Sequence, residues 1–214
     1  MRKALILDFD GVIVESVAIK DWAFAELFKD YPDRLDEILR YHRSHNAVIR
    51  FEKFRHIVQE ILGQPFDGKT QDRLSRRFSS LVVKKIIVCP LVAGAREFLD
   101  VYKNRVPLFL VTINPQTELG TILKKRRLDG YFKGIYAFPW KKPEAFRDIL
   151  QKEKLRPAET VFIGDSPEDF VSANALGIPF IGRQSDKDLA GKGFPVLKDF
   201  GEIKAHLLKQ GHQT

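Results

Sequence analysis

The chain has 214 residues, of which 44% are hydrophobic, and carries a formal net charge of +8 with a single cysteine. This composition excludes a disordered chain and a disulfide-stabilised scaffold, and it suffices for a sizeable core in one large or two small domains. No apolar run reaches the roughly 20 residues of a membrane span, and the first strand begins too early for a signal peptide, so we expect a cytoplasmic protein without a membrane partner.

The first expected element is a buried strand that ends at two acidic residues. Residues 5–12 read Leu-Ile-Leu-Asp-Phe-Asp-Gly-Val, an apolar run that reaches Asp8, Asp10 and Gly11. In an extended backbone, residues two apart point the same way, so the carboxylates of Asp8 and Asp10 can project together. Two anions so close are costly unless a cation or a shared proton relieves the repulsion. The alternative interpretation is a polar turn after an edge strand.

The next segment, residues 15–87, shows helical rather than strand periodicity. Apolar residues recur at three- and four-residue steps, most clearly over 51–62, and Gly63 suits a helix end. We therefore expect an α-helical cap at 15–87, inserted into a catalytic core formed by residues 1–14 and 88–214.

Four polar residues of the expected cap are candidates for substrate selection. Arg50 and Lys53 lie one helical turn apart, so this pair could hold a second anionic group on a substrate; a solvated helix edge is the alternative. His42 and His45 fall in an expected loop, where a histidine is usually only polar.

From Val92 onward, expected helices and strands alternate along the chain. The expected strands are 107–111, 134–137, 160–164, 178–181 and one near Val196, and the expected helices are 94–103, 117–128, 143–154, 168–176 and 202–208. This alternation predicts an α/β fold with a doubly wound, Rossmann-like parallel sheet that has helices on both faces.

A second acidic cluster follows the expected strand 160–164. It reads Gly-Asp-Ser-Pro-Glu-Asp, in which Ser166 and Pro167 suit a helix start and Asp169 would face back toward Asp165. Open α/β sheets bind their ligands at the carboxyl ends of their strands, where both acidic clusters lie. A small set of oxygen ligands suits Mg²⁺.

Four short motifs now stand in a fixed order along residues 5–170. They are Asp-Phe-Asp-Gly-Val at 8–12, Thr112 after an apolar strand, a lysine in Trp-Lys-Lys-Pro-Glu at 140–144, and the acidic cluster at 164–169. In this order the chain resembles the haloacid dehalogenase superfamily of phosphohydrolases and phosphotransferases. Its nearest resemblance is to the branch with a helical cap that includes phosphoglycolate phosphatases and beta-phosphoglucomutases.

The resemblance implies a role for each catalytic residue. Asp8 would attack phosphorus to form an aspartyl-phosphate, and Asp10 would protonate the leaving oxygen and later activate water. Thr112 would bind phosphoryl oxygens, and Lys142 would neutralise charge around the nucleophile. Dehalogenases of the superfamily typically lack the second acid, so Asp10 favours phosphoryl chemistry.

The resemblance also implies a metal site and a phosphate site. Mg²⁺ would be held by the Asp8 carboxylate, the backbone carbonyl of Asp10 and Asp165. Asp169 would join this metal shell, or would only complement the helix dipole. The substrate candidates of the core are the groups beside the reacting acids, namely Gly11, Ile113 and Asn114.

Two motifs depart from the usual pattern of the superfamily. Thr112 is followed by Ile113 before Asn114, whereas the family commonly has Asn directly after Thr or Ser, which puts substrate contact by Asn114 in doubt. The lysine motif reads Lys141-Lys142-Pro-Glu rather than Lys-Pro-x-Pro. Lys142 is favoured over Lys141 because it directly precedes the proline.

These observations predict a Mg²⁺-dependent phosphatase of a small phosphorylated metabolite, acting as a monomer or homodimer. The alternatives are a sugar phosphomutase of the same superfamily, a phosphatase of nucleotides or nucleic-acid ends, and a low-activity binding protein. The positive charge would draw phosphates of any kind. Because Lys and Arg are dispersed, with 124–127 as the only run of four, a nucleic-acid partner is disfavoured.

Overall fold

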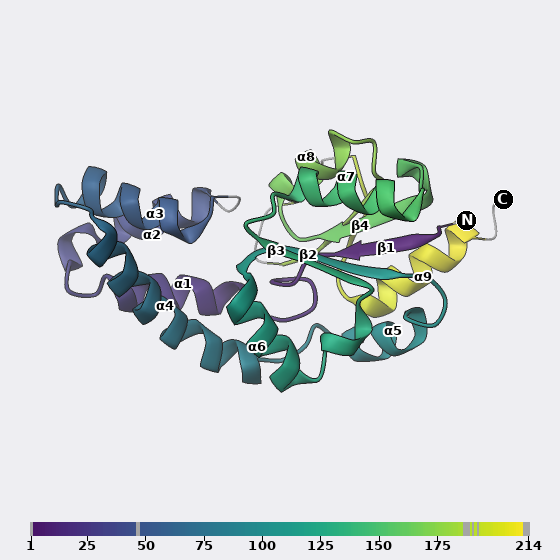
Figure 1. Cartoon of the computed structure of the whole chain (residues 1–214), viewed down its shortest axis with the longest axis horizontal. Coiled ribbons are helices and arrows are strands. Elements are labelled where there is room, and N and C mark those ends of the chain that lie inside the picture. The colour runs from purple at the N-terminus through teal and green to yellow at the C-terminus, as the bar shows by residue number, and fades with distance from the viewer. Residues whose placement is uncertain (1, 46–47, 186–188, 190, 192, 212–214) are drawn as a thin grey trace. The chain divides into compact units, whose positions relative to one another are not determined.

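The computed structural model describes residues 2–45, 48–185, 189, 191 and 193–211 (Figure 1). The chain divides into two compact units, a core unit of Met1–Glu15 with Cys89–Thr214 and a helical unit of Ser16–Val88. The expected boundaries, after residues 14 and 87, lie one residue away from these. None of the helices in the described part of the chain combines the length and the apolarity that crossing a membrane requires.

The core unit is built on one six-stranded sheet in which every neighbouring pair is parallel. In chain order its strands are β1 (Ala4–Leu7), β2 (Leu108–Pro115), β3 (Gly134–Phe138), β4 (Thr160–Gly164), β5 (Phe180–Arg183) and β6 (Val196–Leu197). The spatial order is β3-β2-β1-β4-β5-β6, so the chain builds outward from β1 first on one side and then on the other. This order places a topological switch point between β1 and β4 and confirms the predicted doubly wound α/β class.

Helices cover both faces of this sheet. The core-unit helices are α5 (Ala95–Tyr102), α6 (Gln116–Arg126), α7 (Lys142–Glu153), α8 (Pro167–Asn174) and α9 (Phe200–Gly211), with short 3₁₀ turns at Asp129–Tyr131 and Pro157–Glu159. Figure 1 shows α7 and α8 over one face and α5, α6 and α9 over the other. Strand β1, in the centre, is at most 1% exposed at each of its residues, which is why it reads as a continuous apolar run.

Aromatic side chains fill the layer between the sheet and α7. Phe146 of α7 packs on Phe162 of β4 with ring centroids 4.8 Å apart, and Phe162 packs on Phe180 of β5 at 5.8 Å. Both Phe146 and Phe162 are fully buried. Truncating either ring to alanine would cost about 3–5 kcal/mol of stability, enough to loosen the strands that carry the acidic clusters.

The helical unit holds α1 (Val17–Leu27), a 3₁₀ turn (Pro32–Arg34), α2 (Leu35–Ser44), α3 (Arg50–His56), a π-helical segment (Ile57–Ile61) and α4 (Gly68–Val88). Its centre is an aromatic cluster in which Phe24 contacts Phe54 and Phe78 at centroid distances of 5.7 and 5.1 Å. The placement of His42 in a loop was wrong: His42 lies on α2 and is only 7% exposed. His45 follows α2 directly and is exposed.

Two strands of the core unit, β2 and β5, differ from their predicted bounds by two residues or more at an end. Strand β2 continues to Pro115 rather than ending at residue 111, because after a register shift Pro115 pairs with Phe138 of β3. Strand β5 begins at Phe180 rather than at 178, because the Ile178 N–H donates to Ala173 O and so closes α8. The longer β2 carries Thr112 and Asn114 as part of the strand.

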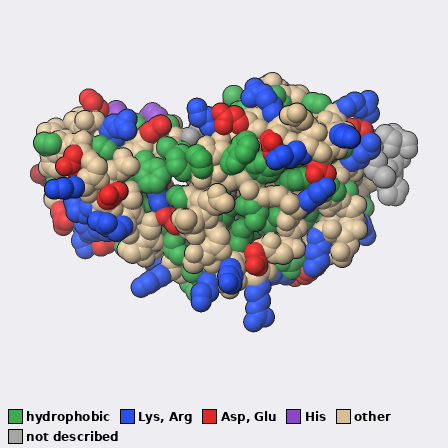
Figure 2. Space-filling view, viewed as in Figure 1, with side chains coloured by type: hydrophobic (Ala, Val, Ile, Leu, Met, Phe, Trp, Pro, Cys, Tyr) green, Lys and Arg blue, Asp and Glu red, His purple; other side chains and the backbone are tan. Residues whose placement is uncertain are grey.

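Charged side chains of both signs are mixed on one face of the protein. On the face drawn in Figure 2, Lys and Arg side chains are spread widely, with Asp and Glu among them. Such a mixture of signs on this face is typical of a solvated surface.

Candidate active site

Asp8 lies at the carboxyl end of the central strand. Its N–H donates to Ile163 O at 2.9 Å, which continues the β1–β4 ladder one step beyond Leu7. Its Oδ1 accepts from the Phe9 N–H at 2.6 Å, and the residue is 7% exposed. The backbone of two strands therefore fixes a nearly buried carboxylate at the switch point of the sheet.

A tight loop follows and carries Asp10. The Phe9 carbonyl accepts from the N–H groups of Ile13 at 2.9 Å and Val14 at 3.2 Å, and the Gly11 N–H donates to Val14 O at 2.9 Å. Gly11 has a φ of +72°, a left-handed conformation that glycine adopts without strain. The loop turns back immediately after Asp10 and leaves its carboxylate beside Asp8.

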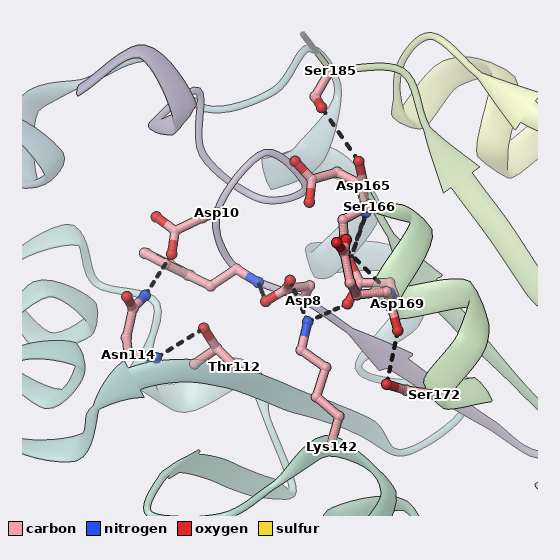
Figure 3. A network of polar contacts seen from close by, with 12 residues as sticks. Asp8, Asp10, Thr112, Asn114, Lys142, Asp165, Ser166, Asp169, Ser172 and Ser185 are labelled. Atoms are coloured by element: carbon pink, nitrogen blue, oxygen red, sulfur yellow. Dashed lines mark hydrogen bonds and ion pairs between the residues drawn. The ribbon is translucent and has the colours of Figure 1, made fainter. Parts of the chain in front are cut away.

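Asn114, one of the predicted substrate residues, contacts Asp10. Its Nδ2 donates to Asp10 Oδ2 at 2.6 Å, and its backbone N–H lies 3.4 Å from Thr112 Oγ1 (Figure 3). Thr112 is 2% exposed. The extension of β2 past Val111 is what brings Asn114 to Asp10. The sequence carried no signal for this pair, because the apolar pattern ends at Val111 and does not predict that β2 continues to Pro115.

Lys142 begins α7 and reaches the same cluster. Its Nζ donates to Asp8 Oδ2 at 2.7 Å and also to Asp169 Oδ1, with the lysine side chain 11% exposed. Lys141, the residue before the helix, is exposed. Because Pro143 sets the helix start, the second lysine of the pair is the one directed toward Asp8.

Asp169 is held by the start of α8. Its Oδ2 accepts from the N–H groups of Asp165 at 3.1 Å and Ser166 at 3.2 Å, and Ser166 Oγ accepts from the Asp169 N–H at 3.2 Å. With Oδ1 bonded to Lys142, both oxygens of Asp169 accept hydrogen bonds from the protein. A Cβ on Gly164 would lie 2.6 Å from the Asp169 Cβ, so only glycine permits this approach.

Three buried carboxylates meet where β1 and β4 end. Asp8, Asp165 and Asp169 each offer one oxygen, and these oxygens all lie within 4.8 Å of one another (Figure 3). An all-oxygen donor set of this kind fits a hard divalent cation, which would also relieve the repulsion between the acids. Asp10 was the fourth residue expected at the metal, and only through its backbone carbonyl. Its side chain contacts Asn114 instead of joining the three acids.

Burial and charge shift the titration of Asp8 and Lys142. Burial raises the pKa of Asp8, and the nearby Lys142 ammonium only partly offsets this effect. Burial works to lower the pKa of Lys142, but the carboxylates of Asp169 and Asp8 outweigh it and raise that pKa. Lys142 is therefore a permanent positive charge next to Asp8.

The two cap candidates have partners inside the helical unit. Lys53 is 4% exposed, and its Nζ donates to His42 O at 2.9 Å, so the solvated helix edge considered for it was wrong. The Nη2 of Arg50 donates to Ser79 Oγ at 3.2 Å, and its guanidinium lies 5.2 Å from the Phe78 ring centroid. Both side chains tie α3 to neighbouring helices, and substrate contact by either stays a prediction.

Known proteins share this fold and sequence pattern. A phosphoglycolate phosphatase of Pseudomonas putida is 24% identical over 192 residues, which cover 85% of this chain and 69% of the relative. A crystal structure described as a predicted phosphoglycolate phosphatase from Haemophilus somnus matches with a TM-score of 0.79 and 18% identity, over 96% of this chain and 98% of that chain. CbbY from Rhodobacter sphaeroides, solved in complex with phosphate, matches with a TM-score of 0.75 and 19% identity, over 95% of this chain and 96% of that chain.

At these identities the solved structures show a shared fold. The sequence itself carries the family assignment, because the model of the haloacid dehalogenase-like hydrolases matches residues 5–183, most of the chain. The resemblance found in the four motifs is thereby confirmed: the chain belongs to the haloacid dehalogenase-like hydrolase family.

Proposed function

We propose that the protein is a Mg²⁺-dependent phosphatase that hydrolyses a small phosphorylated metabolite through an aspartyl-phosphate on Asp8. The observation that carries this proposal is the contact of 2.7 Å between Lys142 Nζ and Asp8 Oδ2 beside two further buried acids. A phosphate dianion is repelled by a carboxylate nucleophile, and a lysine with a divalent cation offsets that repulsion.

The first step forms a bond between an Asp8 oxygen and phosphorus while the bond from phosphorus to the ester oxygen breaks. Asp10 donates a proton to that leaving oxygen, so an alcohol departs. Asn114, hydrogen-bonded to Asp10 Oδ2, orients the carboxyl group for this transfer. Thr112 Oγ1 and the N–H group of Ile113 are the proposed donors to the phosphoryl oxygens, whereas the Gly11 N–H already donates to Val14 O at 2.9 Å.

In the second step Asp10 acts as the base. It takes a proton from water, whose oxygen attacks phosphorus, and the bond between phosphorus and the Asp8 oxygen breaks to release inorganic phosphate. Lys142 remains positively charged throughout and stabilises the Asp8 carboxylate as it is regenerated. Mg²⁺ held by Asp8, Asp165 and the Asp10 carbonyl, with Asp169 close by, would supply charge neutralisation at the transferring phosphoryl group.

The substrate class is a phosphoric monoester of a small metabolite. Phosphatase relatives and the family assignment support this class, and a phosphoglycolate-like acid or a sugar phosphate is the first candidate. The helical unit would act as a cap that selects the leaving group and excludes bulk water. A cytoplasmic location and a monomeric or homodimeric state remain predictions.

A metabolite screen tests the proposal. Purified protein is assayed with Mg²⁺ against phosphorylated acids, sugar phosphates and nucleotides, with released phosphate as the readout. Wild type should release phosphate from at least one small monoester, Asp8→Asn should not, and Asp129→Asn, which alters an exposed acid of the core unit, should match wild type. Activity that persists in Asp8→Asn, or an inactive wild type across the panel, would overturn the proposal. An isomerised sugar phosphate without free phosphate would identify a phosphomutase instead.

A further inference from the structure

An arginine that lies far from Asp10 in the sequence, at the end of β5, contacts the loop that carries Asp10. Arg183, the last residue of β5, is 8% exposed. Its Nη1 donates to Gly11 O at 3.1 Å and to Glu15 Oε2 at 2.8 Å, and its Nη2 donates to Glu15 Oε1. These partners are 172 and 168 positions away along the chain, and neither Arg183 nor Glu15 belongs to the four family motifs.

The guanidinium and the backbone of Arg183 also have partners in and directly after β6. Its Nε donates to Lys198 O at 3.2 Å, and the backbone of Arg183 pairs with Leu197 of β6. A planar guanidinium that binds a carboxylate through two parallel hydrogen bonds fixes the orientation as well as the distance of its partner. Arg183 is therefore a rigid anchor at the carboxyl end of the sheet.

This anchor holds both ends of the loop that follows Asp10. Gly11 is the residue directly after Asp10, and Glu15 is the last residue of the core unit before the helical unit. The same stretch is joined to the returning chain by hydrogen bonds from Glu15 N to Pro90 O and from Val92 N to Ile13 O, both 3.0 Å long. Arg183 thus contacts the backbone one residue away from Asp10.

We propose that Arg183, through Glu15 and the Gly11 carbonyl, is a positioning residue that sets the place from which Asp10 delivers its proton. The inference rests on the proposed function, because it takes Asp10 as the general acid. The hydrogen bonds of Arg183 go to Gly11, Glu15 and Lys198 and not to the nucleophile. Its loss should act selectively on reactions in which the leaving group needs a proton.

The test compares two leaving groups in Arg183→Met, Arg183→Lys and Glu15→Gln. An alkyl phosphate needs the proton from Asp10, whereas p-nitrophenyl phosphate releases a stable anion without it. The quantity to compare is kcat/KM, which reports the steps up to release of the leaving group. Arg183→Met should lower kcat/KM for the alkyl phosphate about tenfold to a hundredfold and for p-nitrophenyl phosphate less than about threefold, with partial recovery in Arg183→Lys.

Arg96→Met is the matched control, because Arg96 also donates to two backbone carbonyls, Arg126 O and Arg127 O, but does so at the end of α6. It should leave the ratio of the two kcat/KM values at the wild-type level. Equal losses on both substrates in the Arg183 variants would overturn the inference. If Arg183→Met does not fold, Arg183→Lys and Glu15→Gln decide by the same ratio. A wild type inactive on both substrates would instead refute the proposed function.

Discussion

The Nζ of Lys142 lies 2.7 Å from Asp8 Oδ2 although the two residues are 134 positions apart in the sequence. The same ammonium also binds Asp169 Oδ1. One cation between two buried carboxylates holds the end of β1 against the start of α8. It also keeps a positive charge at the point where a phosphoryl group would meet the nucleophile.

Replacing Lys142 should therefore be far more damaging than replacing its neighbour. Lys142→Met should lower kcat for p-nitrophenyl phosphate by about a hundredfold or more, because the Asp8 carboxylate loses its compensating charge. Lys141→Met is the control, since Lys141 is exposed. Steady-state kinetics on both variants, with the fold checked by circular dichroism, measures the difference. Equal losses in the two variants would contradict the assigned role.

The meeting of the acids was predictable because parallel strands bring their carboxyl ends to one edge, whereas the role of Lys142 was implied by the resemblance to the family. Leu7 pairs with Ile163, so the residues that follow, Asp8 and Gly164, must lie side by side. No such rule places Asn114 on Asp10 or Arg183 on Gly11. Those contacts depend on the extension of β2 past residue 111 and on the path of a loop, neither of which hydrophobic periodicity encodes.

The helical unit shows a second limit of pattern reading. Helix α2 was not predicted because its buried face contains only Ile38 and His42. A histidine counts as polar in any periodicity, yet here the ring stacks on Phe24 with centroids 3.8 Å apart. The solvated helix edge considered for Lys53 was wrong for a related reason. Its buried ammonium is hydrogen-bonded to the backbone carbonyl of His42, and the sequence does not reveal this contact.

Gly164 should be intolerant of even a methyl group. In Gly164→Ala the new Cβ would meet the Asp169 side chain at 2.6 to 2.8 Å, so the start of α8 must shift. We expect a loss of about 1–3 kcal/mol in the free energy of unfolding, the usual cost of overpacking, and a higher divalent-metal concentration needed for half-maximal activity. Gly120→Ala, on helix α6 with nothing within 4 Å of its added Cβ, should be neutral or stabilising. Denaturant titration measures the free energy of unfolding of both variants. An unchanged stability in Gly164→Ala would refute the packing argument.

Substitutions of Asp165 and Asp169 should differ in their effect on the Mg²⁺ concentration that activity requires. Both oxygens of Asp169 already accept hydrogen bonds from the protein, one of them from Lys142, so Asp169→Asn should chiefly lower kcat by loosening that lysine. Asp165→Asn should chiefly raise the Mg²⁺ concentration needed for half-maximal activity, about tenfold or more. Activity measured over a Mg²⁺ titration distinguishes the two. The same rise in Mg²⁺ requirement for both variants would make Asp169 a full metal ligand.

The buried His42 should make the helical unit sensitive to acid. Its Nδ1 lies 3.1 Å from Lys53 Nζ and its Nε2 lies 3.1 Å from Asp21 Oδ1, so a neutral ring accepts from the lysine and donates to the carboxylate. Burial, helped by the charge of Lys53 and opposed by Asp21, lowers the pKa of His42 to about 4. The unfolded chain, with an ordinary pKa near 6.5, then binds a proton before the folded chain does. Stability must fall as the pH drops from about 6.5 to about 4, by about 3 kcal/mol in total.

His42→Gln removes this titration while keeping a hydrogen-bonding side chain. Free energies of unfolding measured by denaturant titration at pH 7.5 and pH 4.5 should show a clearly larger loss in wild type than in His42→Gln. The exposed His45 supplies the control, and His45→Gln should keep the wild-type dependence on pH. Equal losses of stability in wild type and His42→Gln between the two pH values would contradict the prediction. The ring would then already be protonated in the folded protein at the lower pH, where its Nδ1 could not accept a hydrogen bond from Lys53.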